Sequence, residues 1–151
     1  MLQRLAKWLG AGDARSDRGR KPRVALAVAV LLVELMRSDR ELAAGERAMV
    51  LRVLEQSFPQ ENPQGLLDEA HGVSHQATDY FAFTSVLNEQ MDQPQKIALV
   101  ERLWQVAYED GQARAEEMHT IDRIAGLLHV THGEYIAAKL HAKQAAGMSP
   151  G

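Results

Sequence analysis

The chain contains no cysteine among its 151 residues, and only 5% of its residues are aromatic. The missing cysteine excludes disulfides, thiolate metal ligands and a thiol nucleophile. Runs of β-branched residues are also few, whereas Ala, Leu, Glu, Gln and Arg, which lose little on entering a helix, are plentiful. With 46% hydrophobic and 25% charged residues, the chain has the composition of one globular domain that can bury its own core. We therefore predict an all-α fold.

The chain also lacks a hydrophobic run that could cross a membrane. Its longest apolar stretch, residues 24–36, already includes Glu34, whereas a membrane-spanning helix needs about 20 apolar residues. The first residues are not followed by the apolar region and small-residue cleavage site of a secretory signal. We therefore expect a cytoplasmic protein, with peripheral contact at the inner face of the membrane as the alternative.

Charge is unevenly distributed along the chain. Residues 1–23 contain seven Lys or Arg and two Asp, so the remainder has ten basic and eighteen acidic residues. An acidic body repels phosphate, and no aromatic residues interleave with the basic ones, so a nucleic-acid partner is not expected.

We interpret residues 1–21 as a basic arm and linker. Leu2, Leu5, Trp8 and Leu9 share a helical spacing that would place them on one face. Such an arm can bury its apolar face in an anionic lipid surface while its charges meet the headgroups. We favour the alternative that these four residues dock on the domain itself.

Proline and capping residues divide the rest of the chain into about seven helices that pack as a compact bundle, with a helical domain at 22–144 and a disordered tail at 145–151. Asn62 with Pro63, Asp79, and Asp92 with Pro94 are expected to open helices. The last helix should follow a capping box of Thr131 and Glu134 and use Tyr135, Ile136 and Leu140 as its apolar positions.

A weak repeat relates the two halves of the domain. A shift of 71 residues superimposes 26–54 on 97–125, and it aligns Asp39 with Asp110 and Glu46 with Glu117. The helix phase and the position of the turn agree as well. We interpret this as a duplicated helix-turn-helix hairpin with pseudo-two-fold symmetry.

Helical phase directs the four aligned acids inward. Glu46 lies four residues before Val50, and Glu117 lies four before Ile121, so both fall on the buried stripe of their helix. If the helix before each turn is extended to these positions, Asp39 and Asp110 also face inward. A carboxylate that faces a core is costly unless it is hydrogen-bonded, paired or metal-bound.

Two interpretations of these acids remain open. Each Glu can stand at the third helical position and accept a hydrogen bond from the N-cap amide, which requires no ion. Alternatively, Asp39, Glu46, Asp110 and Glu117 meet between the hairpins and bind a hard divalent cation, Ca²⁺ or Mg²⁺. The site is not an EF-hand, because Gln112, Arg114 and Ile121 occupy the positions where that loop has Asp or Asn, Asp or Asn, and Glu.

The paired segments MRSDRELAAGERAMVLRVL and AYEDGQARAEEMHTIDRIAGLL resemble the TerB-type tellurite-resistance proteins and the related helical domain found beside some membrane-anchored J-domain co-chaperones. The resemblance covers roughly Val24 to Leu140. It implies a helical domain with internal pseudo-symmetry, an acidic cluster that binds divalent metal, and work alongside membrane-bound protein partners. The first hairpin reads Asp39-Arg40, where the family usually has Asp-Gly.

No Gly-rich phosphate loop, nucleophile elbow or HExxH motif occurs in the chain, so we do not expect an enzyme. Two functions follow from the acids. One is a metal-binding stress-response module that acts with a membrane-associated partner. The other is a structural interaction module in which the acids only cap helices and the binding surface lies elsewhere, in a groove near Trp104 and Tyr108.

Overall fold

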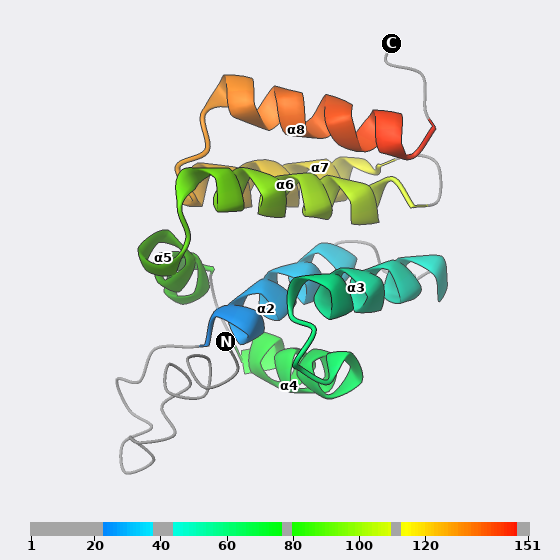
Figure 1. Ribbon diagram of the computed structural model, residues 1–151, viewed down its shortest axis with the longest axis vertical. Helices are drawn as coiled ribbons and strands as arrows, with labels where there is room; N and C mark the ends of the chain where they lie inside the picture. Colours follow the sequence, from blue (N-terminus) through cyan, green and yellow to red (C-terminus); the bar gives the residue numbers. More distant parts are fainter. Residues whose placement is uncertain (1–22, 38–43, 77–79, 110–112, 148–151) are drawn as a thin grey trace.

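The computed structural model describes residues 23–37, 44–76, 80–109 and 113–147 (Figure 1). Within these ranges the chain forms seven helices and no strand, so the all-α prediction is confirmed. The helices are α2 (Val24–Arg37), α3 (Ala44–Ser57), α4 (Pro63–Gln76), α5 (Phe81–Gln90), α6 (Gln93–Ala107), α7 (Ala115–Leu127) and α8 (His132–Ala145). None of them is long and apolar enough to cross a bilayer.

Helix α2 lies at the centre of the bundle. Every residue from Ala25 to Val33 is buried, and α2 contacts α3, α4, α5, α6 and α7. A helix that is hydrophobic all round is stable in water only when neighbours cover every face, and these five helices do so. The longest apolar run of the chain is therefore the core helix of the fold.

The helices form two groups of three that are joined through α5. Helices α2, α3 and α4 occupy the lower half of Figure 1, and α6, α7 and α8 the upper half. The most extensive contacts within the groups are α2 with α4 and α6 with α8. Helix α3 begins at Ala44 and α7 begins at Ala115, 71 residues later. These positions agree with the sequence repeat, although duplication itself stays an interpretation.

Local sequence signals start two of the helices as predicted. Asp92 is the N-cap of α6, where its side chain accepts the amide of Gln95 at 2.9 Å. Thr131 caps α8, and its Oγ1 accepts the amide of Glu134 at 3.2 Å. Helix α5 differs, because it begins at Phe81 with Tyr80 as its N-cap and no side-chain cap bond. The expected cap, Asp79, lies outside the described residues.

Helix α8 does not turn all of its large apolar residues toward the core. Ala138 and Ala142 are buried, whereas Ile136 and Leu140 are 37% and 39% exposed. The small alanines allow α8 to approach α6 closely, and this close contact turns the larger residues outward. Of the three apolar positions that the sequence marked in this helix, only Tyr135 packs against the core.

The C-terminal end of α8 extends slightly beyond the expected domain boundary. Ala145 closes the helix and Ala146 is its C-cap. Gly147 follows with φ of 76°, and its amide donates to the carbonyl of Gln144 at 3.0 Å. A left-handed residue after a helix is the usual position for glycine. Residues 148–151 of the predicted tail lie outside the described ranges.

Candidate functional site

Glu117 is the one predicted acid whose side chain the structure describes. It is the third residue of α7 and is 1% exposed, so the prediction that it faces inward is confirmed. Its Oε1 accepts the backbone amide of Arg114, the N-cap residue, at 3.0 Å. This bond satisfies an amide that the helix itself cannot, and it places the negative charge at the positive end of the helix dipole. The bond that the capping interpretation requires is therefore present at this residue.

The other three predicted acids cannot be placed against Glu117. Asp39 and Asp110 lie outside the described residues, and so does the side chain of Glu46. The backbone of Glu46 is described, and it occupies the third position of α3, as Glu117 does in α7. Among the side chains that the structure does describe, no three His, Asp or Glu converge as a metal site would require.

The helix ends that are nearest to these acids in the sequence lie on the same side of the bundle. The C-terminal ends of α2 and α6 and the N-terminal ends of α3 and α7 all lie toward the right of Figure 1. Helix α3 also contacts α6 directly. In this view the ends of both hairpins therefore lie toward the same side of the molecule.

An aromatic cluster stands beside this region at the end of α6. Trp104 is fully buried and stacks on Tyr108, with 5.4 Å between ring centroids, and meets Tyr135 of α8 edge-on at 5.7 Å. Lys139 and Lys143 of α8 lie over the rings of Trp104 and Tyr108, at 5.1 and 5.9 Å from the centroids. Burial raises the pKa of Tyr108. Burial first, and then the charge of Asp122, raises the pKa of Tyr135 to about 12.

A pocket of about 460 Å³ opens against Tyr108 between α3, α6 and α8. A groove was expected near Trp104 and Tyr108, and of these two residues only Tyr108 lines the pocket. Its polar wall was not predicted from the sequence, because these side chains come together only when three helices pack. The lining consists of Met49, Arg52, Val53, Gln56, Gln105, Tyr108, Glu109, Ala142, Ala145 and Ala146.

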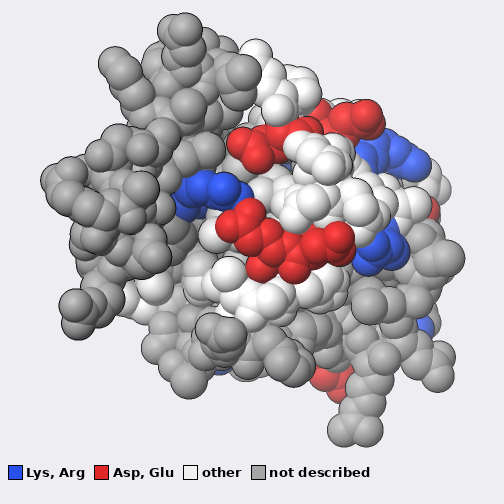
Figure 2. All heavy atoms as spheres, turned by 90° about the horizontal axis from the view of Figure 1, so that it is seen from below, with Lys and Arg blue, Asp and Glu red and all other residues white. Residues whose placement is uncertain are grey.

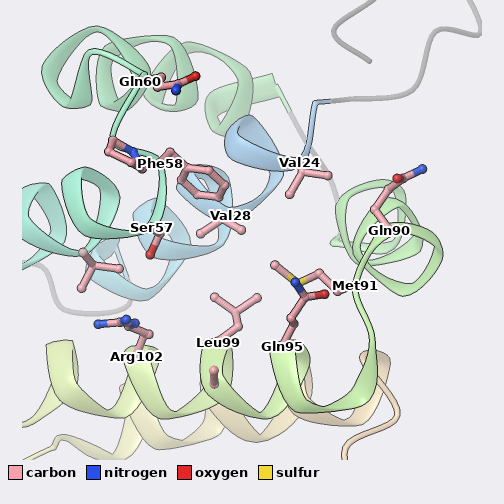
Figure 3. Close-up of a pocket in the computed structure, with 13 residues that line it drawn as sticks. Val24, Val28, Ser57, Phe58, Gln60, Gln90, Met91, Gln95, Leu99 and Arg102 are labelled. Atoms are coloured by element: carbon pink, nitrogen blue, oxygen red, sulfur yellow. The ribbon is translucent and has the colours of Figure 1, made fainter. Parts of the chain in front are cut away.

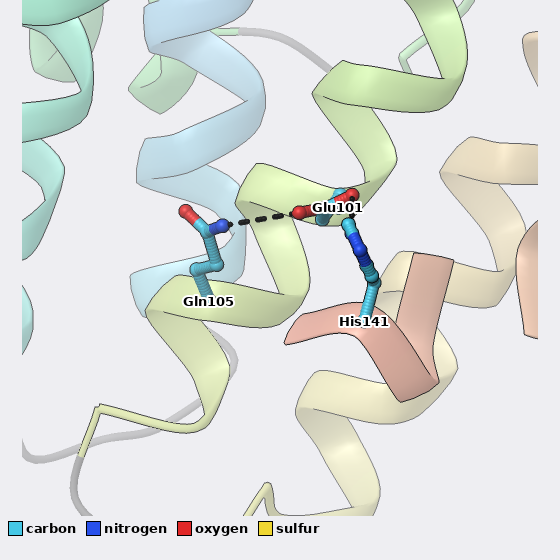
Figure 4. A network of polar contacts seen from close by, with 3 residues as sticks. All are labelled: Glu101, Gln105 and His141. Atoms are coloured by element: carbon cyan, nitrogen blue, oxygen red, sulfur yellow. Dashed lines mark hydrogen bonds and ion pairs between the residues drawn. The ribbon is translucent and has the colours of Figure 1, made fainter. Parts of the chain in front are cut away.

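Polar side chains also connect α6 to α8. Glu101 of α6 pairs with His141 of α8, with 3.1 Å between Oε1 and Nδ1 (Figure 4). Gln105, one turn further along α6, donates to Oε2 of Glu101 at 3.4 Å. The His141 side chain is 71% exposed, so solvent screens this pair and it contributes little to stability.

The face formed by α4 is acidic. Figure 2 views the molecule from below Figure 1, and acidic side chains gather near the centre of that face. Asp68 and Glu69 of α4 are both exposed. Glu69 pairs with Arg23, the residue just before α2, and Asp68 accepts from Gln64 at 3.0 Å. This surface therefore suits a basic partner segment rather than an anionic one.

The predicted contact residues of the N-terminal arm, Leu2, Leu5, Trp8 and Leu9, lie outside the described residues. The structure consequently tests neither lipid contact nor docking on the domain.

Comparison with known proteins identifies the domain. A family model described as "Tellurite resistance protein TerB" matches residues 25–140, more than half of the chain. No curated protein and no solved structure matches the chain significantly. The matched region begins in α2 and ends in α8, so it includes all of α3 to α7, most of α2 and α8, and both predicted hairpins. The chain belongs to the TerB family of tellurite-resistance proteins.

Proposed function

We propose that this protein is a non-enzymatic, metal-binding module that acts in tellurite or a related stress response. In this proposal Asp39, Glu46, Asp110 and Glu117 hold one divalent cation, Ca²⁺ or Mg²⁺. These hard ions take carboxylate and carbonyl oxygens as ligands, and all four side chains supply such oxygens. The proposal does not depend on any catalytic group.

The observation that carries the proposal is the position of Glu117. Its carboxylate is 1% exposed at the end of a hairpin, and burying a charged group is costly without strong compensation. The matching third position of α3 holds a second glutamate, Glu46. The family match supports a common site at both hairpins.

A second candidate function has its own support. The bond from the Arg114 amide to Glu117 is what a helix cap alone would form. In that case the protein is a structural interaction module, and the pocket beside Tyr108 is its natural binding surface. The two candidates differ in whether a divalent ion stabilises the fold.

An ion titration of the purified full chain separates the two candidates. A ligand that binds only the folded state stabilises it in proportion to the logarithm of its concentration. Calorimetry and thermal unfolding with Ca²⁺, Mg²⁺, Mn²⁺ and Zn²⁺ should therefore show binding heat and a rise in Tm for at least one ion. The absence of both effects with every ion would leave only the interaction module.

We further propose that the module works in the cytoplasm with a membrane-associated protein partner. The support is the family membership together with the lack of a membrane-spanning helix in the described ranges. Co-sedimentation with membranes from the source cell, before and after a salt wash and protease treatment of the membranes, tests this part. Loss of sedimentation after protease treatment identifies a protein partner, whereas binding to protein-free vesicles contradicts it.

A further inference from the structure

A second pocket, separate from the predicted metal site, opens at the start of α2. It has a volume of about 440 Å³, within the range of about 300–1,000 Å³ in which proteins bury drug-sized ligands. Val28, Phe58, Met91 and Leu99 converge on its centre (Figure 3). They come from α2, the α3–α4 connection, the α5–α6 connection and α6. The pocket is therefore an apolar recess between the two groups of helices.

The chain enters the described structure at the rim of this pocket. Val24, the first residue of α2, lines the pocket, and Arg23 is held beside it by its ion pair with Glu69. The C-terminal end of the N-terminal segment therefore adjoins the pocket. Residues 10–22 separate its apolar positions from this point, and an extended chain spans up to about 3.3 Å per residue. The segment can consequently reach every part of the recess.

The chemistry of the N-terminal segment complements the pocket. Leu2, Leu5, Trp8 and Leu9 offer one apolar face, and the segment is strongly basic. The pocket centre is apolar, and acids flank it in sequence, with Glu61 after the lining residue Gln60 and Glu89 before the lining residue Gln90. Arg102, the one cation in the lining, lies at the opposite end from Val24 (Figure 3).

We propose that the N-terminal segment of the same chain occupies this pocket, with Trp8 and its neighbouring leucines against Phe58, Met91 and Leu99. Tethering favours this occupant over a free ligand, because a short linker gives an effective concentration of order millimolar. The docked segment buries its apolar face and leaves its basic residues outside the recess. The contact does not require a metal, so a negative result for the ion site would not contradict this docking proposal.

Tryptophan fluorescence of the full chain tests the docking. The chain has two tryptophans, and Trp104→Phe leaves Trp8 as the only one. In this background, Ala98→Arg places a cation in the pocket lining at an exposed position, and Ala137→Arg on α8 is the matched control at an exposed position that does not line the pocket. Far-ultraviolet circular dichroism confirms that each variant is folded.

The expected result is a blue-shifted Trp8 emission that acrylamide quenches weakly, both in the background and in Ala137→Arg. Ala98→Arg should shift the emission to the red and raise the quenching several-fold. Emission like that of the unfolded chain in all three proteins would overturn the proposal. A blue shift that appears only after anionic vesicles are added would overturn it too, because the segment would then be a lipid anchor.

Disulfide trapping gives a second measurement that leaves Trp104 and the apolar face unchanged. The chain contains no cysteine, so Lys7→Cys with Ala98→Cys introduces a unique pair. Lys7→Cys with Ala137→Cys is the control. Mild oxidation should link the first pair within one molecule and leave the second reduced, because a disulfide forms only when the Cα atoms approach to about 4.4–6.8 Å. Equal trapping of the two pairs contradicts docking in this pocket.

Discussion

Glu117 and Glu134 make the same bond in different surroundings. Oε1 of Glu117 accepts the amide of Arg114 at 3.0 Å, and Oε1 of Glu134 accepts the amide of Thr131 at 2.9 Å. Glu117 is buried, whereas Glu134 is partly exposed and has a lowered pKa, chiefly because of the Thr131 backbone bond. Glu134, whose Oε1 also accepts from Nε2 of Gln93 at 3.0 Å, is therefore a partly exposed reference for a capping glutamate.

This pair yields the first prediction. Glu117→Gln keeps an oxygen acceptor for the Arg114 amide, so its cost in unfolding free energy should be at most about 1 kcal/mol. If Glu117 binds an ion, the rise in Tm on adding that ion disappears in Glu117→Gln and persists in Glu134→Gln. Thermal unfolding with and without the ion measures this. An unchanged ion response in Glu117→Gln would remove it from the ligand set.

Asn88 provides a second test, because it connects α5, α6 and α7. Its Nδ2 donates to the carbonyl of Leu127 at 2.9 Å, and its Oδ1 accepts from Nζ of Lys96 at 3.1 Å. Lys96 is only 7% exposed. Asn88→Ala removes both bonds and should lower the unfolding free energy by about 2 kcal/mol. Asn88→Asp keeps an acceptor for Lys96 and should cost less in urea denaturation, so equal losses would show that the Lys96 contact is unimportant.

His129 lies in the turn between α7 and α8 with a φ of 60°. The amides of His129 and Val130 donate to the carbonyls of Gly126 and Ala125, at 3.1 and 3.0 Å, which is the bonding pattern of a Schellman motif. A left-handed residue with a Cβ costs about 1–2 kcal/mol. His129→Gly should therefore raise the unfolding free energy, by up to about 1 kcal/mol after the added flexibility of the unfolded chain is included. His129→Ala retains the Cβ and should not stabilise the protein, and a gain in that variant would contradict this explanation.

Tyr135 makes stability fall at alkaline pH. Its pKa is about 12 in the folded protein and 10.0 for an unperturbed tyrosine. Between these values the folded protein retains a proton that the unfolded chain releases, so stability decreases as pH rises. The contribution is complete below pH 10.0 and is lost by about pH 12. Denaturant unfolding across this range should show a shallower decline in Tyr135→Phe, and parallel curves would contradict the shifted pKa.

Helix starts and the inward phase of Glu117 were accessible from the sequence because they depend on residues within one turn of each other. Asp92 and Thr131 cap their helices through bonds to residues three positions ahead, and Glu117 shares its helical face with buried Ile121. The all-α fold and the central position of α2 followed from composition and from one long apolar run. These properties need no knowledge of the neighbouring helices.

The outward orientation of Ile136 and Leu140 and both pockets depend instead on how helices pack. The sequence of α8 offers two possible apolar faces, and contact with α6 selects the one with Ala138 and Ala142 because small residues allow the closer approach. The pockets arise between segments such as Phe58 and Leu99, which are distant in sequence and carry no common motif. The sequence by itself determined where α6 and α8 begin and that Glu117 is buried, through short-range hydrogen bonding and periodicity. Only the tertiary structure decided which surfaces meet, because that choice is made by shape complementarity between residues far apart along the chain.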